Sequence, residues 1–411
     1  HFFGNPSAKL KIVGVTGTNG KTTTATLLYR IATALGYKAG LIGTVENMIL
    51  GEKIEAKYTT PDPISLNKLL SLMVSRGCEY VFMEVSSHAL DQNRVAGLTF
   101  AGGIFTNLTH DHLDYHKSFD NYFTAKKKFF KMLSLDTFAL SNADDEYGAK
   151  MFEGIKARKS LYCFDGCEKC QGESLTCFHG KIEKLDFNGL ELEINGPACP
   201  HDTPGAGGEK INSKLLGKFN AYNLLAVWSA CSLLGFDMEK VNKIIRHIEP
   251  PAGRFQCFTS SSGVLVIIDY AHTPDALENV LKTVKTSFVG KKIISVFGCG
   301  GDRDPLKRSK MGRIGAALSD IPIFTSDNPR SENPNKIIAD MMAELYPEDF
   351  KKVKAIPNRR EAILEAIKIA QNGDIILCAG KGHEDYQEIK GVRYPFDDME
   401  EFKKVYDSIS S

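Results

Sequence analysis

Runs of apolar residues alternate with segments of helical periodicity through most of the chain. Residues 11–15 form a short apolar run, which predicts a buried strand. Residues 22–35 carry apolar side chains at helical spacing and precede Gly36, so we predict a helix that ends at this glycine. The apolar face of this helix consists of Leu27, Leu28, Ile31, Ala34 and Leu35. Further strand-like runs lie at 80–85, 103–106 and 138–141. The alternation predicts an α/β fold with a largely parallel sheet and helices on both faces.

The pattern changes between residues 156 and 212. Residues 189–194 alternate between apolar and polar side chains, and residues 197–208 are rich in proline and glycine. These features predict antiparallel strands and a loop that belong to the same domain as the preceding sheet. Helical periodicity resumes at residues 220–234.

Residues 249–254, with the sequence Glu-Pro-Pro-Ala-Gly-Arg, mark the expected domain boundary, because two prolines and a glycine interrupt both helix and sheet. A second alternation follows, with strand-like runs at 264–268, 292–297, 321–325 and 374–378. A chain of 411 residues is also too long for a single hydrophobic core. We therefore predict two domains, residues 1–250 with the mostly parallel sheet and residues 251–411 as a smaller Rossmann-like domain.

The composition bears on partners and cellular location. Lys and Arg total 51 and Asp and Glu total 50, and the net charge of +1 argues against a broad attraction to nucleic acid or to a membrane surface. No apolar run approaches the roughly 20 residues that span a bilayer. The ten cysteines are scattered without a tight framework, which favours reduced thiols. We expect a cytoplasmic protein that acts on small molecules and has no nucleic-acid or membrane partner.

The strongest chemical signal is Thr-Gly-Thr-Asn-Gly-Lys-Thr-Thr at positions 16–23, between a predicted strand and a predicted helix. Glycines allow backbone N–H groups to turn toward phosphate oxygens, and the helix N-terminus adds its dipole. Lys21 would reach the outer phosphates of a nucleotide, and Thr22 would bind Mg²⁺. These features predict that the first domain is a P-loop domain. A glycine-rich turn that binds no ligand is the alternative interpretation.

Three further features surround this loop in the predicted sheet. Glu84 ends a predicted strand, where a carboxylate oxygen suits a cation that bridges phosphates. The sequence Thr-Asn-Leu-Thr-His-Asp-His-Leu-Asp-Tyr-His at 106–116 also follows a strand, and a solvated loop is the alternative for its histidines. Lys126 begins a run of three lysines, and such runs usually face water.

The sequence at 16–23 resembles the ATP-binding loop of the Mur ligase superfamily, which includes folylpolyglutamate synthases. Further motifs extend the resemblance from about Phe2 to the C-terminus. It implies an ATP- and Mg²⁺-dependent ligase of peptidoglycan synthesis, which adds meso-diaminopimelate to UDP-N-acetylmuramoyl-L-alanyl-D-glutamate through an acyl phosphate. The implied ATP-binding residues are Gly17, Thr18, Asn19, Gly20, Lys21, Thr22, Thr23, Asn220, Asn223, Arg254 and Asp269. Helix capping is the alternative role for the two asparagines at 220 and 223.

The resemblance also implies a set of metal ligands and catalytic residues. The implied metal ligands are Thr22, Glu84, His112 and Lys126, and the implied catalytic residues are Lys21, Lys126 and His112. Lys126 matches the lysine that the family carbamoylates. An amine is a poor ligand for a hard cation, whereas a carbamate supplies an anionic oxygen.

Three motifs of the second domain follow predicted strands, where open α/β sheets bind ligands. They are Gly-Gly-Asp-Arg-Asp at 300–304, Asp-Asn-Pro-Arg at 327–330 and Gly-Lys-Gly-His-Glu at 380–384. A diamino acid with a second carboxylate needs a guanidinium partner, Arg330 or Arg303, and its distal ammonium needs an acid such as Glu384. Asp-Asn-Pro-Arg resembles the signature of relatives that add meso-diaminopimelate, although a plain Asn-Pro turn would give the same backbone. The implied amino-acid-binding residues are Arg303, Asp327, Asn328, Arg330, Gly380 and Glu384.

The remaining expectations concern the second substrate and the rival functions. Thr59, Thr60, Ser87 and Arg94 resemble the family's contacts to the muramoyl dipeptide, with an ordinary turn and loop as the alternative. Residues 2–7 resemble the junction that follows the family's UDP-binding domain, so we expect that domain to be absent from this chain. A lysine-adding or folylpolyglutamate-type ligase is one rival, and a non-catalytic nucleotide-binding module is another. We expect a monomer.

Overall fold

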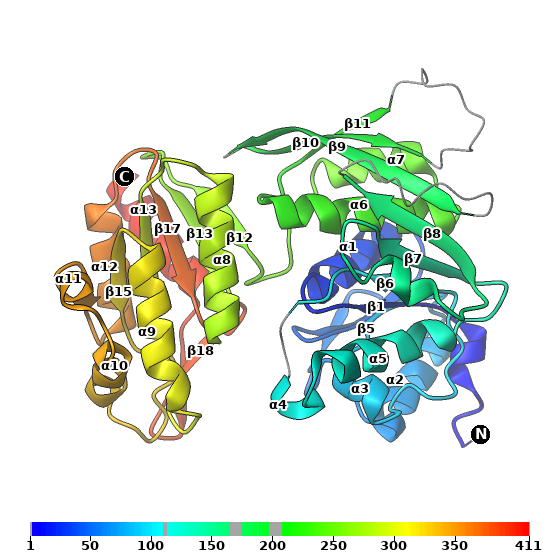
Figure 1. Cartoon of the computed structure of the whole chain (residues 1–411), viewed down its shortest axis with the longest axis horizontal. Coiled ribbons are helices and arrows are strands. Elements are labelled where there is room, and N and C mark those ends of the chain that lie inside the picture. The colour runs from blue at the N-terminus through cyan, green and yellow to red at the C-terminus, as the bar shows by residue number, and fades with distance from the viewer. Residues whose placement is uncertain (1, 110–112, 165–174, 187, 197–207, 411) are drawn as a thin grey trace. The chain divides into compact units, whose positions relative to one another are not determined.

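The computed structural model describes residues 2–109, 113–164, 175–186, 188–196 and 208–410. The chain divides into two units, His1–Pro251 and Ala252–Ser411 (Figure 1). Each unit is built on one main sheet, and we describe each unit by itself.

Unit 1 contains an eleven-stranded sheet with the order β11-β10-β9-β8-β7-β6-β1-β5-β2-β3-β4. Its strands are β1 (Lys11–Thr16), β2 (Ala39–Ile42), β3 (Asn47–Ile49), β4 (Glu52–Ile54), β5 (Tyr80–Glu84), β6 (Gly102–Phe105), β7 (Phe138–Asn142), β8 (Arg158–Cys163), β9 (Thr176–Asp186), β10 (Gly189–Asn195) and β11 (Glu209–Ser213). In this spatial order, all neighbouring strands between β9 and β2 are parallel, which confirms the predicted largely parallel sheet.

Antiparallel pairing occurs at both ends of this sheet. Strands β3 and β4 extend one edge, and β10 and β11 extend the other. The predicted antiparallel excursion is therefore confirmed from β9 to β11, within the same sheet. It is wrong for β8, which pairs in parallel with both β7 and β9, because alternation along one strand does not reveal the direction of the next strand. The predicted loop at 197–208 lies almost entirely outside the described residues.

Helices cover both faces of the sheet of unit 1, with α1 and α6 on one face and α2, α3 and α5 on the other (Figure 1). The helices are α1 (Lys21–Ala34), α2 (Pro63–Ser75), α3 (Ser87–Asp91), α4 (Leu113–His116), α5 (Phe119–Lys131), α6 (Lys218–Leu233) and α7 (Met238–Ile245), with 3-10 turns at Pro6–Lys9 and Ala149–Phe152. The predicted apolar face of α1 is buried at Leu27, Leu28 and Ile31. It is exposed at Ala34, in the last turn of the helix.

Glycines on two central strands bring α5 close to the sheet. A Cβ atom on Gly14 of β1 would lie 2.5 Å from the ring of Phe129, and one on Gly103 of β6 would lie 2.7 Å from the same ring. Lys126 is three residues before Phe129 and Tyr122 four residues before that, so all three lie on one helical face. The close packing of Phe129 therefore directs Lys126 and Tyr122 toward the loop that follows β1.

Unit 2 contains a six-stranded sheet with the order β12-β13-β17-β14-β15-β16. Its strands are β12 (Gln256–Thr259), β13 (Leu265–Asp269), β14 (Ile293–Phe297), β15 (Ile321–Phe324), β16 (Lys354–Ala355) and β17 (Ile375–Ala379), and a separate hairpin joins β18 (Tyr386–Ile389) to β19 (Val392–Pro395). Only the pairing of β12 with β13 is antiparallel in the six-stranded sheet. The predicted Rossmann-like alternation is thus present, and the carboxyl ends of β13, β14, β15 and β17 share one edge.

The helices of unit 2 lie on both faces of its sheet (Figure 1). They are α8 (Pro274–Ser287), α9 (Leu306–Leu318), α10 (Pro334–Met342), α11 (Pro347–Phe350), α12 (Arg359–Ile369) and α13 (Asp398–Ser410). Ile363 of α12 and Phe402 of α13 are fully buried in the same apolar cluster as Ile268 and Ile376 of the central strands. This cluster anchors both helices beneath the loops that follow the strands.

Two expectations concern membrane-spanning helices and the oxidation state of the cysteines. Among the helices described, none combines the length and apolar character needed to cross a membrane. The cysteines at 78, 163, 231, 257, 299 and 378 are reduced, as expected. The expectation of reduced thiols is wrong for Cys177, which is disulfide-bonded, since the cysteine spacing carried no signal for that bond.

Candidate functional site

The loop between β1 and α1 has two positions that only glycine fits. Gly17 has a φ of 149°, and a Cβ atom there would lie 1.9 Å from Thr106 Oγ1. Gly20 has a φ of 86°, and a Cβ atom there would lie 2.3 Å from Asn223 Oδ1. Both glycines therefore relieve a steric conflict and supply a backbone conformation that other residues rarely adopt.

The loop after β6 is hydrogen-bonded to the loop after β1 at several points. Thr106 Oγ1 donates to the Asn19 carbonyl at 2.6 Å, and the Thr18 N–H donates to the Asn107 carbonyl at 2.8 Å. The Asn19 N–H donates to Asn107 Oδ1 at 2.9 Å, and the Thr109 N–H donates to Thr18 Oγ1 at 2.9 Å. These bonds fix the curvature of the β1–α1 loop before any ligand arrives.

Lys21 and Thr22 open α1, and Thr23 is buried in the same first turn. The Lys21 ammonium donates to the carbonyls of Gly17 and Thr18 at 3.0 and 2.7 Å, so it lies over the loop. An ammonium held there, at the positive end of a helix, creates a site for an anion such as a phosphate.

Glu84, at the end of β5, is hydrogen-bonded to the first turn of α1. It is 1% exposed and accepts hydrogen bonds from Thr22 Oγ1 at 2.9 Å, from the Thr44 N–H at 2.7 Å and from Thr44 Oγ1 at 3.1 Å. A buried carboxylate beside a threonine hydroxyl offers hard oxygen donors, which fit Mg²⁺. The donor chemistry of Thr22 and Glu84 is thus suitable for the ion that the sequence implied.

Lys126 is 1% exposed, although it belongs to a run of lysines. Its Nζ donates to the Gly17 carbonyl at 2.6 Å and lies 4.5 Å from the centre of the Tyr122 ring. The Tyr122 hydroxyl is in turn 3.0 Å from Thr18 Oγ1. The side chain of Lys126 therefore ends directly beneath the β1–α1 loop.

The neighbouring lysines point elsewhere. Lys127 pairs with Glu153 at 2.7 Å, and the half-exposed Lys128 pairs with Asp91 at 3.4 Å. The alternative in which the whole run faces water is thus wrong for Lys126. His112, the remaining implied metal ligand, lies outside the described residues.

Asn220 and Asn223 lie in the first turns of α6, and both are buried. Gly217 occupies the N-cap position, so neither asparagine caps the helix, and that alternative is wrong. Asn220 Nδ2 donates to the Leu216 carbonyl at 2.8 Å, and Asn223 Nδ2 donates to Asn220 Oδ1 at 3.1 Å. This chain of amides leads from α6 to Gly20, whose missing side chain leaves room for Asn223.

The four residues implied in dipeptide binding gather near Glu84. Thr60 Oγ1 donates to the Glu84 carbonyl at 2.8 Å, and Thr59 Oγ1 accepts from Thr44 Oγ1 at 3.0 Å. Arg94 donates from Nη1 to the Thr60 carbonyl at 3.0 Å. Ser87 Oγ is buried and has no hydrogen-bond partner among the described residues, which suits a hydroxyl that serves a ligand.

In unit 2, Asp269 ends β13 and its carboxylate accepts two backbone N–H groups, those of Phe255 and Ala271, each at 2.9 Å. Burial raises the pKa of Asp269, while the Arg254 charge and these hydrogen bonds oppose the rise. The Arg254 guanidinium lies 5.2 Å from the centre of the Tyr270 ring, and its buried Nε has no partner in the described part of the chain. An arginine held in this way has donors available for an anion.

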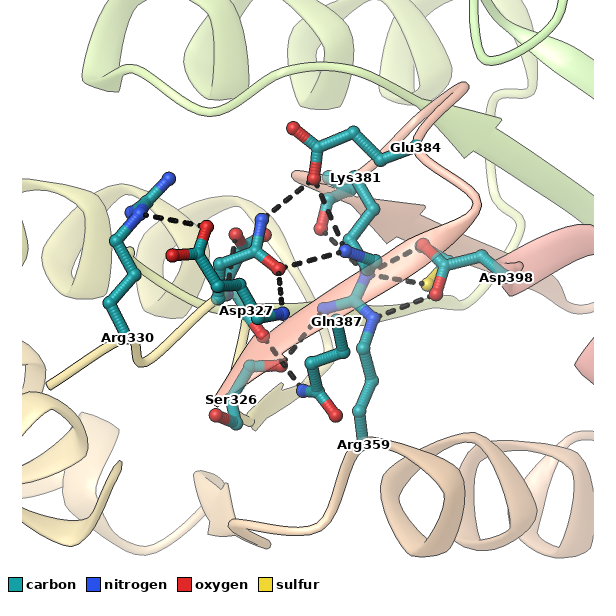
Figure 2. A network of polar contacts seen from close by, with 12 residues as sticks. Ser326, Asp327, Arg330, Arg359, Lys381, Glu384, Gln387 and Asp398 are labelled. Atoms are coloured by element: carbon teal, nitrogen blue, oxygen red, sulfur yellow. Dashed lines mark hydrogen bonds and ion pairs between the residues drawn. The ribbon is translucent and has the colours of Figure 1, made fainter. Parts of the chain in front are cut away.

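The loops after β15 and β17 meet through hydrogen bonds of Asn328 with Glu384 and Lys381. Figure 2 shows Lys381 and Glu384 together with Asp327 of the other loop. Asn328 Nδ2 donates to Glu384 Oε2 at 2.8 Å, and Asn328 Oδ1 accepts from the Lys381 ammonium at 3.3 Å and from the Glu388 N–H at 2.9 Å. Lys381, which is 0% exposed, also pairs with Glu384 at 3.2 Å. Sequence reasoning missed Lys381, although it lies inside the quoted Gly-Lys-Gly-His-Glu motif, because nothing in the motif revealed that it is buried.

Asp327 and Gly380 form the closest approach of the same two loops. A Cβ atom on Gly380, whose φ is 115°, would lie 2.6 Å from Asp327 Oδ2. Asp327 Oδ2 is buried and has no hydrogen-bond partner among the residues described. A buried carboxylate oxygen without a donor is unfavourable, and an ammonium group of a ligand would satisfy it.

The two implied arginines differ in how firmly they are held. Arg330 adopts a φ of 49°, and its Nη1 donates to the Gly301 carbonyl at 2.8 Å while its Nε lies 3.6 Å from Glu388 Oε2. Arg303 is exposed, with Nη1 3.4 Å from the Asp302 carbonyl. Arg330 is therefore the better positioned guanidinium of the pair.

Two family models match the chain. The Mur ligase middle domain covers residues 15–231, and the Mur ligase glutamate ligase domain covers residues 253–382. The chain therefore belongs to the Mur ligase family, whose members are ATP-dependent enzymes that form amide bonds.

Two curated relatives carry the same name, UDP-N-acetylmuramoyl-L-alanyl-D-glutamate–2,6-diaminopimelate ligase. The protein from Cytophaga hutchinsonii is 50% identical over 409 residues, and the alignment covers 100% of this chain and 80% of the relative. The protein from Parabacteroides distasonis is 49% identical over 411 residues, with the same coverage.

Solved structures agree with these relatives. A structure that bears the same ligase name has 33% identity and a TM-score of 0.69, and the match covers 98% of this chain and 79% of that one. Folylpolyglutamate synthase from Thermotoga maritima has a TM-score of 0.68 at 15% identity, over 92% of this chain and 88% of that one. At that identity the second match shows a shared fold.

The steric requirement at Gly17 yields a prediction for nucleotide binding. In Gly17→Ala the added methyl group must displace Thr106 or the loop, and a displacement of about 1 Å costs roughly 100-fold in a positioned site. We expect ATP affinity, measured by equilibrium dialysis, to fall by that order. Gly36→Ala, at the other end of α1, is the control, since Gly36 has a φ of 92° but open space around it. It should destabilise the fold by about 1 kcal/mol and leave ATP affinity unchanged. Equal ATP affinities in the two variants would contradict the role of Gly17.

Proposed function

We propose that this chain catalyses the ATP-dependent joining of meso-diaminopimelate to the D-glutamate carboxylate of UDP-N-acetylmuramoyl-L-alanyl-D-glutamate, a step in the synthesis of peptidoglycan precursors. The observation that carries the proposal is the roughly 50% identity, over the entire chain, to relatives that bear this name. Two side chains support the same substrate. Asp327 Oδ2, which is buried and has no hydrogen-bond partner among the described residues, suits an ammonium, and the firmly held Arg330 suits a distal carboxylate.

In this proposal, residues 1–250 bind the dipeptide and most of ATP, and residues 251–411 bind the amino acid and contribute two residues to ATP binding. The loop residues Gly17, Thr18, Asn19 and Gly20 present backbone N–H groups to the phosphates, and Lys21 neutralises their charge. Thr22, Glu84, His112 and Lys126 would hold Mg²⁺, which supplies positive charge to the phosphate oxygens. Asn220 and Asn223 are proposed to contact adenine, since an amide can match both donors and acceptors of a purine. Arg254 and Asp269 complete the proposed ATP site.

Lys126 is proposed to react with carbon dioxide before it serves as a ligand. The neutral amine attacks the carbon atom, loses a proton and becomes a carbamate with an anionic oxygen. The Gly17 carbonyl, 2.6 Å from Nζ, would keep the modified side chain beneath the loop.

The proposed chemistry has two steps. A D-glutamate carboxylate oxygen attacks the γ-phosphorus of ATP and breaks its bond to the ADP oxygen, which gives an acyl phosphate. The diaminopimelate amine then attacks the acyl carbon, and phosphate leaves with the original carboxylate oxygen as the amine loses a proton. The chain contributes by positioning and by charge neutralisation.

The proposed substrate contacts follow from the polar groups at each sheet edge. Thr59, Thr60, Ser87 and Arg94 are proposed to bind the acidic dipeptide. Arg330 and Arg303 are proposed to bind the distal carboxylate of diaminopimelate, and Asp327, Asn328, Gly380 and Glu384 its amino groups. We also propose that the protein is cytoplasmic and monomeric. Sedimentation at the chain mass of 45.3 kDa would support the monomer.

Amine selectivity tests the proposed function. ADP release should be stimulated by meso-diaminopimelate, and not by lysine or glutamate, in the presence of ATP and UDP-N-acetylmuramoyl-L-alanyl-D-glutamate. Arg330→Gln should raise the KM for diaminopimelate by about 30-fold or more, because it removes a charge partner worth at least ~2 kcal/mol. Arg313→Gln, which alters a half-exposed arginine of α9, is the control and should leave the KM unchanged. Stimulation by lysine or glutamate would favour the rival ligases, and no ADP release with any substrate would favour a non-catalytic module.

The proposed carbamate on Lys126 has a spectroscopic test. Protein equilibrated with bicarbonate that carries an NMR-active carbon isotope should show one carbamate resonance. The resonance should vanish in Lys126→Ala, together with at least about 100-fold of the ADP-forming activity. Both should survive in Lys128→Ala, which alters the half-exposed lysine two residues away. A resonance that persists in Lys126→Ala, or full activity without any resonance, would disprove the modification.

A further inference from the structure

A buried ion pair lies beneath the loops that carry the amino-acid-binding residues of unit 2 (Figure 2). Arg359 is the first residue of α12 and Asp398 is the first residue of α13. Arg359 Nε lies 2.7 Å from Asp398 Oδ1, and Nη2 lies 2.7 Å from Oδ2, so the pair is bidentate. Both side chains are 0% exposed.

Stability alone is a weak explanation for such a pair. Removing two charges from water opposes their mutual attraction, and apolar residues of similar volume often serve a protein core equally well. The rest of the apolar cluster around α12 and α13 already holds these helices against the sheet. The contacts that Arg359 makes beyond Asp398 are therefore informative.

The remaining donors of Arg359 reach the ends of two strands. Nη1 lies 3.4 Å from the Ser326 carbonyl, and Nη2 lies 3.1 Å from the Ala379 carbonyl. Ser326 directly precedes Asp327, and Ala379 directly precedes Gly380. The strands concerned, β15 and β17, are separated by β14 in the sheet, and the isolated backbone bridge of Arg330 with Ile389 lies beyond the Gly380–Glu384 loop. The guanidinium therefore links the two loops at the strand ends, where no backbone ladder within the described residues joins them.

The two linked loops must keep a narrow separation. Asp327 Oδ2 lies so close to Gly380 that a Cβ atom would approach it to 2.6 Å. Asn328 bonds to Glu384 and accepts from Lys381 across the same gap. A small change in the distance between the loops would therefore break these contacts. It would also move Asp327 Oδ2, which has no hydrogen-bond partner in the described part of the chain, relative to Glu384.

We propose that the Arg359–Asp398 pair is a positioning element for the amino-acid site, because it fixes the separation of the Asp327–Arg330 loop from the Gly380–Glu384 loop. This inference rests on the proposed function in that it takes meso-diaminopimelate as the amino acid bound there. Asp398 orients the guanidinium, and the guanidinium holds the two carbonyls. Neither residue touches the amino acid.

The chain offers a matched control for this pair. Arg360, the next residue of α12, pairs with Glu401 of α13 through Nε at 2.5 Å and Nη2 at 3.0 Å. It joins the same two helices, but its ring contact is with Phe396 and its side chain is half exposed. Loss of this second pair should disturb the helix contact without reaching the strand ends.

The decisive variant is Arg359→Met combined with Asp398→Leu, which replaces the buried pair with apolar side chains and leaves no buried charge unpaired. In wild type, in this double variant and in Arg360→Gln with Glu401→Gln, we would measure the KM for meso-diaminopimelate, the KM for ATP and the thermal unfolding midpoint. We expect the first double variant to raise the KM for diaminopimelate by roughly 10- to 100-fold, as for a displacement of about 1 Å. The KM for ATP should stay within about twofold. The control should match wild type in both constants.

Arg359→Lys provides a second test if the apolar pair impairs folding. Lysine keeps the charge beside Asp398 but cannot donate in the fork geometry that reaches both carbonyls. The KM for diaminopimelate should again rise selectively. An unchanged KM in a folded Arg359 variant, or an equal rise in the KM values for both substrates, would overturn the proposal.

Hydrogen exchange tests the positioning claim without turnover. The Gly380 N–H donates to the Asp269 carbonyl at 3.1 Å, and the Gly301 N–H donates to the Asn328 carbonyl at 2.9 Å. Both amides should exchange faster in the Arg359→Met, Asp398→Leu variant than in wild type or in the Arg360 control. Unchanged exchange would overturn the pair's role whatever the activity. An absence of diaminopimelate-stimulated ADP release in wild type would instead count against the proposed function.

Discussion

The parallel pairing of β1 with both β5 and β6 is the constraint on which the arrangement of unit 1 depends. The register pairs Val15 with Glu84 and Thr16 with Phe105, so the three strands end at one level and the loops that follow them are forced together. Thr22 can then reach Glu84, and the loop after β6 can hydrogen-bond the loop after β1. Glycine is needed at position 17 because the neighbouring loop fills the space that a side chain would take.

In unit 2, buried charged side chains hold two loops at a fixed separation, as strand pairing does in unit 1. The Asp327–Arg330 and Gly380–Glu384 loops follow strands that are not neighbours, and the one isolated backbone bridge between these segments within the described residues, Arg330 with Ile389, lies beyond Glu384. Lys381 and Arg359 lie in the gap at different depths, one among the side chains of the loops and the other beneath the strand ends. The arrangement proposed for a diamino acid, with Asp327 Oδ2 close to Gly380 and without a hydrogen-bond partner among the described residues, depends on both. Buried charge here supplies geometry more than stability.

The helices, the strands and the P-loop could be predicted from local patterns, because apolar runs, glycine positions and helical phase are all visible within short stretches of sequence. The helical phase that placed Lys126 with Tyr122 agrees with the burial of both side chains. The Arg359–Asp398 pair could not be predicted, since the two residues are 39 positions apart. The local sequence around each residue indicates only a charged side chain at the start of a helix. The parallel pairing of β8 with β7 and β9 was missed for a similar reason, because pairing direction depends on a distant partner. The role of His112 stays a prediction.

The most direct test of the account follows the carboxylate oxygens of the dipeptide. UDP-N-acetylmuramoyl-L-alanyl-D-glutamate labelled with a heavy oxygen isotope in the reacting D-glutamate carboxylate would be incubated with the protein, ATP and meso-diaminopimelate. Mass spectrometry of the inorganic phosphate would then be compared with the ADP released. The account predicts one labelled oxygen in phosphate for each ADP, because activation transfers the γ-phosphoryl group to that carboxylate. Phosphate free of label, with ADP released and the amide formed, would contradict it.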